Sequence, residues 1–220
     1  VRSIPGVEWA VPIDISILTM VTPQGQFEVT ELYGIDDRTL IGAPLDMVEG
    51  DVRQLRGEGA VIVDSYSAKK TLARKGPDGE LIPLHIGDSF EINKHRATVV
   101  GVANITQAFY PQPIIFTSYS SYRDFLAYPS STVRFIVVRA FPGESLEGVI
   151  ERINQVPGLK AMTKDQFETR IARHFLETGI LINFGLSVLL GIIIGFSIAG
   201  QIFYLMTLQN LSYYALIKAL

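Results

Sequence analysis

Charged residues stop abruptly towards the end of the chain, and this divides the sequence into two parts. Of the 220 residues, 19 are basic and 22 are acidic, yet only Lys218 among them lies after Glu177. The 40 residues 178–217 carry no formal charge. A helix on the surface of a soluble protein needs a polar face, so the pattern predicts a soluble domain joined to a membrane segment.

The uncharged part begins with an apolar run from Ile180 to Met206. A bilayer core about 30 Å thick is crossed by about 20 helical residues, and this run exceeds that length. Apolar runs in buried helices of soluble proteins seldom pass roughly 14 residues. We therefore expect a transmembrane helix within residues 176–208.

The predicted membrane helix contains four recurring glycines: Gly185, Gly191, Gly195 and Gly200. Gly191 and Gly195 form a small-xxx-small pattern, which lets the backbone of another helix approach closely. The amide side chains of Asn183 and Gln201 favour a protein neighbour over lipid. We expect this helix to pack against other helices through its glycines.

The first 175 residues contain short β-branched runs bounded by glycine, proline and aspartate, a pattern typical of strands. The predicted strands are Trp9–Ile13, Ile15–Val21, Phe27–Tyr33, Ala60–Val63, Ser89–Ile92, Ala97–Val102, Ile114–Phe116 and Arg134–Arg139. Gln24-Gly25 lies between two of these runs and predicts a hairpin turn.

Helical patterns are fewer in this part. Asp64 or Ser65 is a candidate cap for a short helix through Ala73, and apolar residues between Leu146 and Ile153 follow helical spacing. Because strands and helices mix without regular alternation, the expected fold class is α+β rather than a parallel α/β sheet.

The last helix before the membrane begins at a capping box, Thr163 to Gln166, and carries an apolar stripe of Phe167, Ile171 and Phe175. No proline follows Pro157, so nothing of that kind breaks the helix before Ile180. We expect one continuous helix from the soluble domain into the membrane, with Gly179 as its weak point. A continuous helix would transmit displacement across the membrane.

The sequence lacks the motifs that nucleotide-binding proteins, serine hydrolases and zinc proteins require. There is no phosphate-binding Gly-x-x-x-x-Gly-Lys loop and no Gly-x-Ser-x-Gly nucleophile turn, and the three histidines, His85, His95 and His174, lack zinc-site spacing. Asp36-Asp37 follows a strand and is interpreted as a turn rather than a catalytic pair. A net charge of −3 argues against nucleic acid as a partner. We expect no catalytic residue, metal or cofactor.

A set of motifs in a fixed order resembles FtsX-like permease subunits of ABC transporters, in the branch of the DevC-type and MacB-type exporters. The motifs are Phe27-Glu-Val-Thr, Tyr33-Gly-Ile-Asp36, Ala60-Val-Ile-Val-Asp64, Ile86-Gly-Asp88, Ala97-Thr-Val-Val-Gly101-Val, the apolar helix and Tyr214-Ala-Leu-Ile-Lys-Ala-Leu220. The resemblance implies that residues 1–175 form an α+β domain of the MacB-like periplasmic core type outside the cytoplasmic (inner) membrane. Residues 176–208 would be the second membrane helix, and residues 209–220 the start of a cytoplasmic coupling segment. The chain would then be part of a longer protein.

The same resemblance implies partners. A separate ABC ATPase subunit would be approached by Tyr213, Tyr214, Ala215, Leu216 and Lys218, although Gln209–Ser212 lacks the charges that many relatives carry there. A second permease copy, a periplasmic adaptor protein and membrane lipid are the other expected partners.

The expected function is a non-catalytic permease subunit that couples ATP hydrolysis in its partner to movement of the outer domain, with a lipid, lipoprotein, peptide or drug as substrate. The alternative is a single-pass membrane sensor or binding module, and a membrane-anchored enzyme ranks last.

Overall fold

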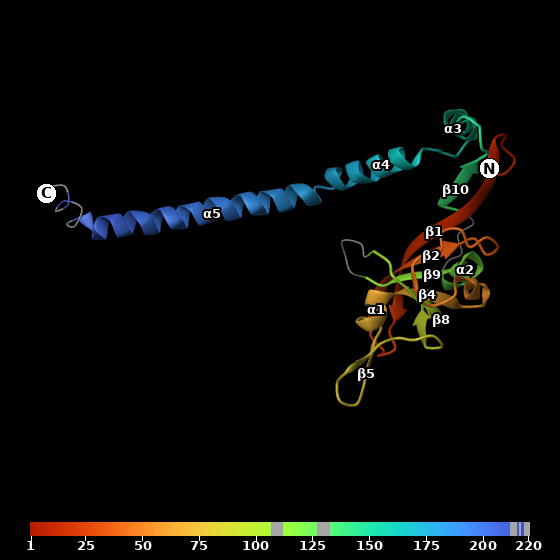
Figure 1. Ribbon diagram of the computed structural model, residues 1–220, viewed down its shortest axis with the longest axis horizontal. Coiled ribbons are helices and arrows are strands. Elements are labelled where there is room, and N and C mark those ends of the chain that lie inside the picture. Colours follow the sequence, from red (N-terminus) through yellow and green to blue (C-terminus); the bar gives the residue numbers. More distant parts are fainter. Residues whose placement is uncertain (107–111, 127–132, 212–214, 216, 218–220) are drawn as a thin grey trace. The chain divides into compact units, whose positions relative to one another are not determined.

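The computed structural model describes residues 1–106, 112–126, 133–211, 215 and 217. Within it the chain forms two compact units, Val1–Arg152 and Ile153–Leu220 (Figure 1). The first unit holds the strands, and the second holds two long helices.

The strands are β1 Val7–Val21, β2 Phe27–Ile35, β3 Met47–Gly50, β4 Ala60–Asp64, β5 Arg74–Lys75, β6 Leu81–Ile82, β7 Ser89–Ile92, β8 His95–Ala103, β9 Ile114–Ser118 and β10 Phe135–Ala140. The helices are the 3₁₀ turn η1 Val52–Arg56, then α1 Ser65–Lys69, α2 Tyr119–Phe125, α3 Leu146–Asn154, α4 Lys164–Glu177 and α5 Ile180–Gln209. The predicted α+β class is confirmed.

The main sheet is mixed and runs in the order β10-β1-β2-β9-β4-β8-β3. The pairs β2–β9 and β4–β8 are parallel, and the other neighbours are antiparallel. In addition, β7 pairs with β8 and with the far end of β1. These pairings close a circuit through β1, β2, β9, β4, β8 and β7, so these strands leave an interior as a small barrel does.

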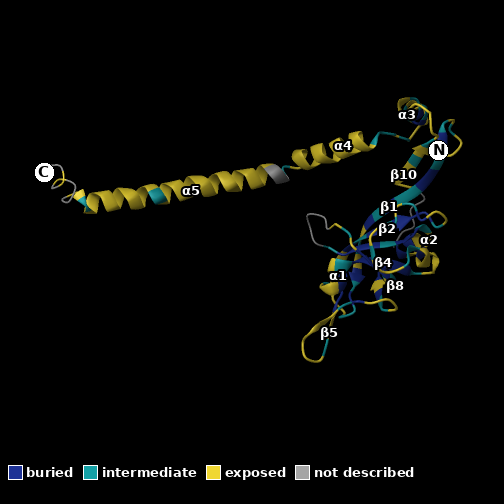
Figure 2. Cartoon of the chain, in the orientation of Figure 1, coloured by how far each residue is buried: buried dark blue, intermediate teal, exposed yellow. Residues whose placement is uncertain are grey.

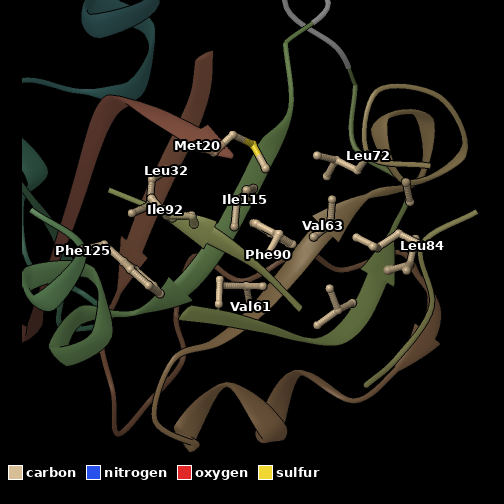
Figure 3. Close-up of a cluster of buried hydrophobic side chains, with 14 of the residues drawn as sticks. Met20, Leu32, Val61, Val63, Leu72, Leu84, Phe90, Ile92, Ile115 and Phe125 are labelled. Atoms are coloured by element: carbon tan, nitrogen blue, oxygen red, sulfur yellow. The ribbon is translucent and has the colours of Figure 1, made fainter. Parts of the chain in front are cut away.

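Apolar side chains fill this interior (Figure 3). Met20, Leu32, Val61, Val63 and Ile115 are completely buried. Phe125 closes one side of the cluster, while Leu72 and Leu84 close the other. The barrel interior is therefore a packed core rather than a ligand cavity.

A second apolar cluster lies on the outside of the same strands, around Ile35, Leu40, Leu55, Ile62 and Ala103. Successive residues of a strand point to opposite faces, so Val61 and Val63 join the inner cluster while Ile62 joins the outer one. All five residues of β4 are buried. A strand covered on both faces has a continuous apolar run, which explains the sequence Ala60-Val-Ile-Val.

The first strand is longer than predicted. Two strands were expected on either side of Asp14, but β1 continues through it from Val7 to Val21. Asp14 is 3% exposed and lies 3.7 Å from the guanidinium of Arg134. The Asp14 carboxylate is thus paired within the sheet. The predicted break between two strands was wrong because Arg134, from a distant segment, takes the place of water around this carboxylate.

Other local predictions had mixed outcomes. The turn at Gln24-Gly25 joins β1 to β2, and α3 begins where its apolar spacing begins. The helix after Asp64 ends at Lys69, before the predicted Ala73. No helix was predicted for Tyr119–Phe125, where Ser118 caps α2 by accepting a hydrogen bond from the Ser121 N–H.

The second unit contains α4 and α5, and Figure 2 shows both as almost wholly exposed. They are two helices, separated at Thr178 and Gly179. The prediction of one continuous helix was therefore wrong. The interruption lies at Gly179, the weak point expected from the sequence, because this residue adopts φ +74°, outside the right-handed helical region.

Candidate functional site: the membrane helix and its flanks

The helix α4 is fixed at its start by the predicted capping box. The Thr163 side chain accepts a hydrogen bond from the Gln166 N–H at 3.2 Å, and the Gln166 side chain accepts one from the Thr163 N–H at 3.1 Å. Two amides of the first turn are satisfied in this way. The sequence before the membrane thus specifies where this helix begins.

The apolar stripe of α4 is partly exposed. Phe167, Ile171 and Phe175 are 39%, 41% and 51% exposed, and no residue of α4 is buried. Lys164 pairs with Glu168 one turn later at 3.6 Å. The helix therefore has an amphipathic surface.

The helix α5 has the dimensions of a membrane span. It contains 30 residues, which corresponds to about 45 Å at about 1.5 Å per residue. Among the residues that the structure describes, it is the one helix long and apolar enough to cross a membrane, over Ile182–Gln209 with a mean hydropathy of 2.2. None of that span is buried, as expected of a surface that faces lipid or other membrane helices.

The four glycines of α5 have open space beside them, because a Cβ added at any of them would meet no atom within 4 Å. At about 100° of rotation per residue, Gly191 and Gly195 share one face, while Gly185 and Gly200 lie on other faces. The structure thus places two of the predicted packing glycines together.

The polar residues of α5 fall into two kinds. The hydroxyls of Ser187 and Ser197 donate to backbone carbonyls one turn earlier, at 2.9 and 2.8 Å. These hydrogen bonds satisfy the hydroxyls within the helix itself. The serines are therefore compatible with lipid, whereas the amides of Asn183 and Gln201 are the groups that gain from a protein neighbour.

The predicted ATPase-coupling residues lie at the end of the chain. Tyr213, Tyr214, Leu216 and Lys218 fall outside the described residues, whereas Ala215 is in helical conformation. Upstream of them α5 ends at Gln209. Its C-cap is Asn210, whose N–H and side-chain amide both donate to the Met206 carbonyl, at 3.1 and 2.8 Å.

The acidic pair Asp36-Asp37 forms a turn, as predicted. The Asp36 carboxylate accepts hydrogen bonds from the N–H and hydroxyl of Thr39 at 2.9 and 2.8 Å. Burial by itself raises the pKa of Asp36, but these bonds and the charge of Arg2, 3.9 Å away, lower that pKa below its ordinary value. Asp37 instead accepts from Ser120 on α2. The two carboxylates therefore have separate structural roles.

Metal-ligating side chains do not gather in the parts of the chain that the structure describes: no group of three or more is found there. His85 lies 3.5 Å from Glu49 on the surface, and His95 makes an edge contact with the ring of Phe125.

A polar group lies on the outer face of β2. Glu31 accepts hydrogen bonds from the Tyr33 hydroxyl at 3.1 Å and from the Gln112 amide at 2.6 Å. Burial raises the pKa of Tyr33 to about 12, and the charge of Glu31 and its hydrogen bond add to the shift. The Tyr33 ring stacks on Phe116 of the parallel neighbour β9 at 4.8 Å. These contacts join β2 to β9.

Residues 1–156 match the MacB-like periplasmic core domain family. The chain belongs to this family. The match begins at the first residue and ends two residues after α3, so it covers the whole barrel-containing unit. The FtsX-like and MacB-like resemblance inferred from the motifs is confirmed.

Two solved structures share the fold of this MacB-like protein. The periplasmic region of MacB from Actinobacillus actinomycetemcomitans aligns over 78% of this chain and 78% of its own, with a TM-score of 0.52 and 17% identity. The extracellular domain of the noncanonic ABC-type transporter YknZ from Gram-positive bacteria aligns over 70% of this chain and 76% of its own, with a TM-score of 0.51 and 14% identity. No curated protein matches the chain in sequence.

Membership of the MacB-like family identifies the chain as a permease-type, non-catalytic component of ABC transporters. The MacB-like domain and the apolar helix α5 together make it a membrane protein with an extracytoplasmic region.

Two features that organise the MacB-like core were not predicted from the sequence. One is α2, for which a serine cap after a β-branched run, Ser118, was the available signal. The other is the pairing of β7 with the end of β1, for which no local signal exists because register between distant strands depends on the assembled sheet.

Proposed function

We propose that this protein is the permease subunit of an ABC transporter that couples ATP hydrolysis in a separate ATPase subunit to movement of its extracytoplasmic domain. The observation that carries the proposal is the covalent order within one chain: a MacB-like core over residues 1–156, then an uncharged helix of membrane length. The movement would serve export, or mechanical transmission, of a lipid, lipoprotein, peptide or drug.

The proposed topology assigns each segment a side. Residues 1–175 lie outside the cytoplasmic membrane, residues 176–208 cross it, and residues 209–220 begin the segment that meets the ATPase. Supporting this division, all 22 acidic residues precede residue 178. The positive-inside rule does not oppose it, because domains of this size translocate largely regardless of charge.

Short links between the last three helices support mechanical coupling. Nine residues, 155–163, separate α3 from α4, and only Thr178 and Gly179 separate α4 from α5. Links this short limit the freedom between neighbouring elements. A displacement of α5 therefore has a short covalent path to α4.

A second copy of the permease is the proposed partner of the face that carries Gly191 and Gly195. Small residues one turn apart let two helix backbones approach closely, which favours van der Waals packing between helices in lipid. Gly185 and Gly200 would contact other membrane helices. On the cytoplasmic side, Tyr213, Tyr214, Ala215, Leu216 and Lys218 would contact the ATPase, and a periplasmic adaptor protein would bind the outer domain.

The decisive experiment is co-purification of the full-length protein with an ABC ATPase in lipid nanodiscs. We expect a stable complex and an ATPase rate that changes when the permease is present. A cysteine introduced by Ala215→Cys should cross-link to the ATPase, whereas one introduced by Thr169→Cys, on α4, should not. A protein that binds no ATPase and continues instead into a signalling domain would establish the single-pass sensor.

A further inference from the structure

The joint between α4 and α5 consists of a single residue with two roles. Gly179 follows the C-cap of α4, Thr178, and it is also the N-cap of α5. Its backbone has φ +74° and ψ 1°, the left-handed conformation that ends many helices. All residues from Lys164 to Gln209 other than Thr178 and Gly179 are helical.

Hydrogen bonds fix the helices on both sides of this residue. The Thr178 N–H donates to the His174 carbonyl at 3.0 Å, and the Gly179 N–H donates to the Leu176 carbonyl at 3.2 Å, which closes α4. The Asn183 N–H donates to the Gly179 carbonyl at 2.9 Å, which opens α5. Gly179 has no side chain to cap the earlier amides of α5, so the amides of residues 180–182 have no helical acceptor in this state.

Rotation of Gly179 into the right-handed conformation would merge the two helices. The amides of residues 180–182 would then pair with carbonyls of residues 176–178, as in any α-helix. A methyl group added at Gly179 would meet no atom within 4 Å, so a substitution there tests backbone conformation rather than packing. Glycine occupies both conformations about equally readily, so both states are accessible.

In the proposed topology the joint lies near the start of the membrane segment, residues 176–208. Glu177 is the last charged residue before the span, and Ile180 is the first residue of α5. A change of conformation here alters how α4 projects from the lipid surface without disturbing either helix.

We propose that Gly179 is a two-state joint: left-handed, it separates α4 from α5, and right-handed, it joins them into one helix that transmits movement rigidly. This inference rests on the proposed function, since the ATPase cycle is what would switch the joint. It assigns the coupling step to one residue between the outer domain and the membrane span.

The variant Gly179→Ala tests the joint directly. Alanine disfavours the left-handed conformation, which should change the ratio of the two states by about 5- to 30-fold towards one helix. Gly179→Asn should retain more of the left-handed state, because asparagine tolerates it. The control is Ser187→Ala, which introduces the same residue at a position that is already helical and whose hydroxyl is bonded within its own helix.

Spin labels report the state. The 220 residues contain no cysteine, so Thr169→Cys and Val188→Cys place one label on each helix of the full-length protein in nanodiscs. In Gly179→Ala the labels sit on one helix, and we expect a single narrow distribution near an axial separation of about 28 Å. The parent and Ser187→Ala should share a second population, and hydrogen exchange at the amides of residues 180–182 should be faster in both than in Gly179→Ala. Identical distributions in the parent and Gly179→Ala would overturn the proposal.

Distance measurements at defined steps of the ATPase cycle test this inference separately from the proposed function. In complex with the ATPase, the parent should shift between its two populations when ATP is trapped, while Gly179→Ala should not. An intact, permease-dependent ATPase rate with no shift in the parent would refute the joint and leave the permease function standing. Failure to bind any ATPase would refute the function itself.

Discussion

Gly34 on β2 and Tyr122 on α2 are in direct contact, and only a glycine leaves room for the tyrosine. A Cβ at position 34 would lie 2.7 Å from the Tyr122 Cβ and 2.9 Å from its Cδ1. Tyr122 is 1% exposed and donates to or accepts from the Ser16 hydroxyl at 2.7 Å. The contact fixes α2 against the barrel, and α2 supplies Phe125 to the core.

The substitution Gly34→Ala should therefore destabilise the outer domain by about 1–3 kcal/mol, the usual cost of forcing extra volume into a packed site. Urea titration of the full-length protein, followed through the fluorescence of Trp9, measures this. Trp9 is the one tryptophan of the chain and lies on β1.

The control for this prediction is Gly148→Ala. Gly148 lies in α3, and an added Cβ would meet its nearest atom only at 3.8 Å. Alanine is favoured over glycine in helices by up to about 1 kcal/mol, so the midpoint should stay or rise. A Gly34→Ala protein as stable as the parent would show that α2 can move away from β2 at little cost.

Asp64 should be among the most important polar residues for stability. It is fully buried, and its two oxygens accept hydrogen bonds from the Ser67 N–H at 2.8 Å and the Ile114 N–H at 2.9 Å. Asp64→Ala removes a helix cap and a charged acceptor, at an expected cost of about 2–4 kcal/mol.

The neighbouring Ser67→Ala provides the contrast. The Ser67 hydroxyl is buried without a hydrogen-bond partner in the described part of the chain, so its removal should leave the unfolding free energy unchanged or raise it. If both substitutions cost the same, the carboxylate hydrogen bonds would not be the source of the Asp64 effect.

Stability should fall at high pH because of Tyr33. Its pKa is raised from 10.0 to about 12 by burial and then by Glu31. The unfolded chain loses this proton first, so the contribution is fully present below pH 10 and is lost as the pH rises towards 12. Comparing the pH dependence of the urea midpoint in the parent and in Tyr33→Phe isolates the effect, and equal slopes above pH 10 would contradict it.

The glycine face of α5 should govern assembly. Gly191→Leu combined with Gly195→Leu should weaken association of two permease copies, because the added side chains separate the helix backbones. Gly200→Leu adds one leucine side chain on another face and should retain the copy-to-copy contact. Cross-linking in native membranes, with the outer domain's protease resistance as the folding control, measures both. Association that survives the double substitution would remove this face from the interface.

Predictions from the sequence succeeded where a few adjacent residues decide the outcome. The capping box at Thr163, the turn at Gly25 and the start of α3 each depend on contacts within one or two turns of chain. The proposed packing and coupling residues follow from composition and family resemblance, and Gly191 with Gly195 is the pair that helical geometry places on one face.

Predictions failed where contacts between distant segments of the chain determine the local structure. The sequence of β1 contains a polar residue that resembles a break, but Arg134, 120 positions later in the chain, supplies its counter-charge. The helix α2 is held by the shape of β2 at Gly34, which no local pattern reveals.

The sequence by itself determined the chemical class of each segment: a charged α+β domain, an amphipathic helix and an uncharged membrane span. Solvation and local hydrogen bonding act over a few residues, so they can be inferred from neighbours in the chain. Tertiary structure alone decided the closure of the barrel through β7 and β1 and the close approach of Gly34 to Tyr122. Such features depend on which distant surfaces meet. Contacts throughout the core contribute to the free energy of that arrangement.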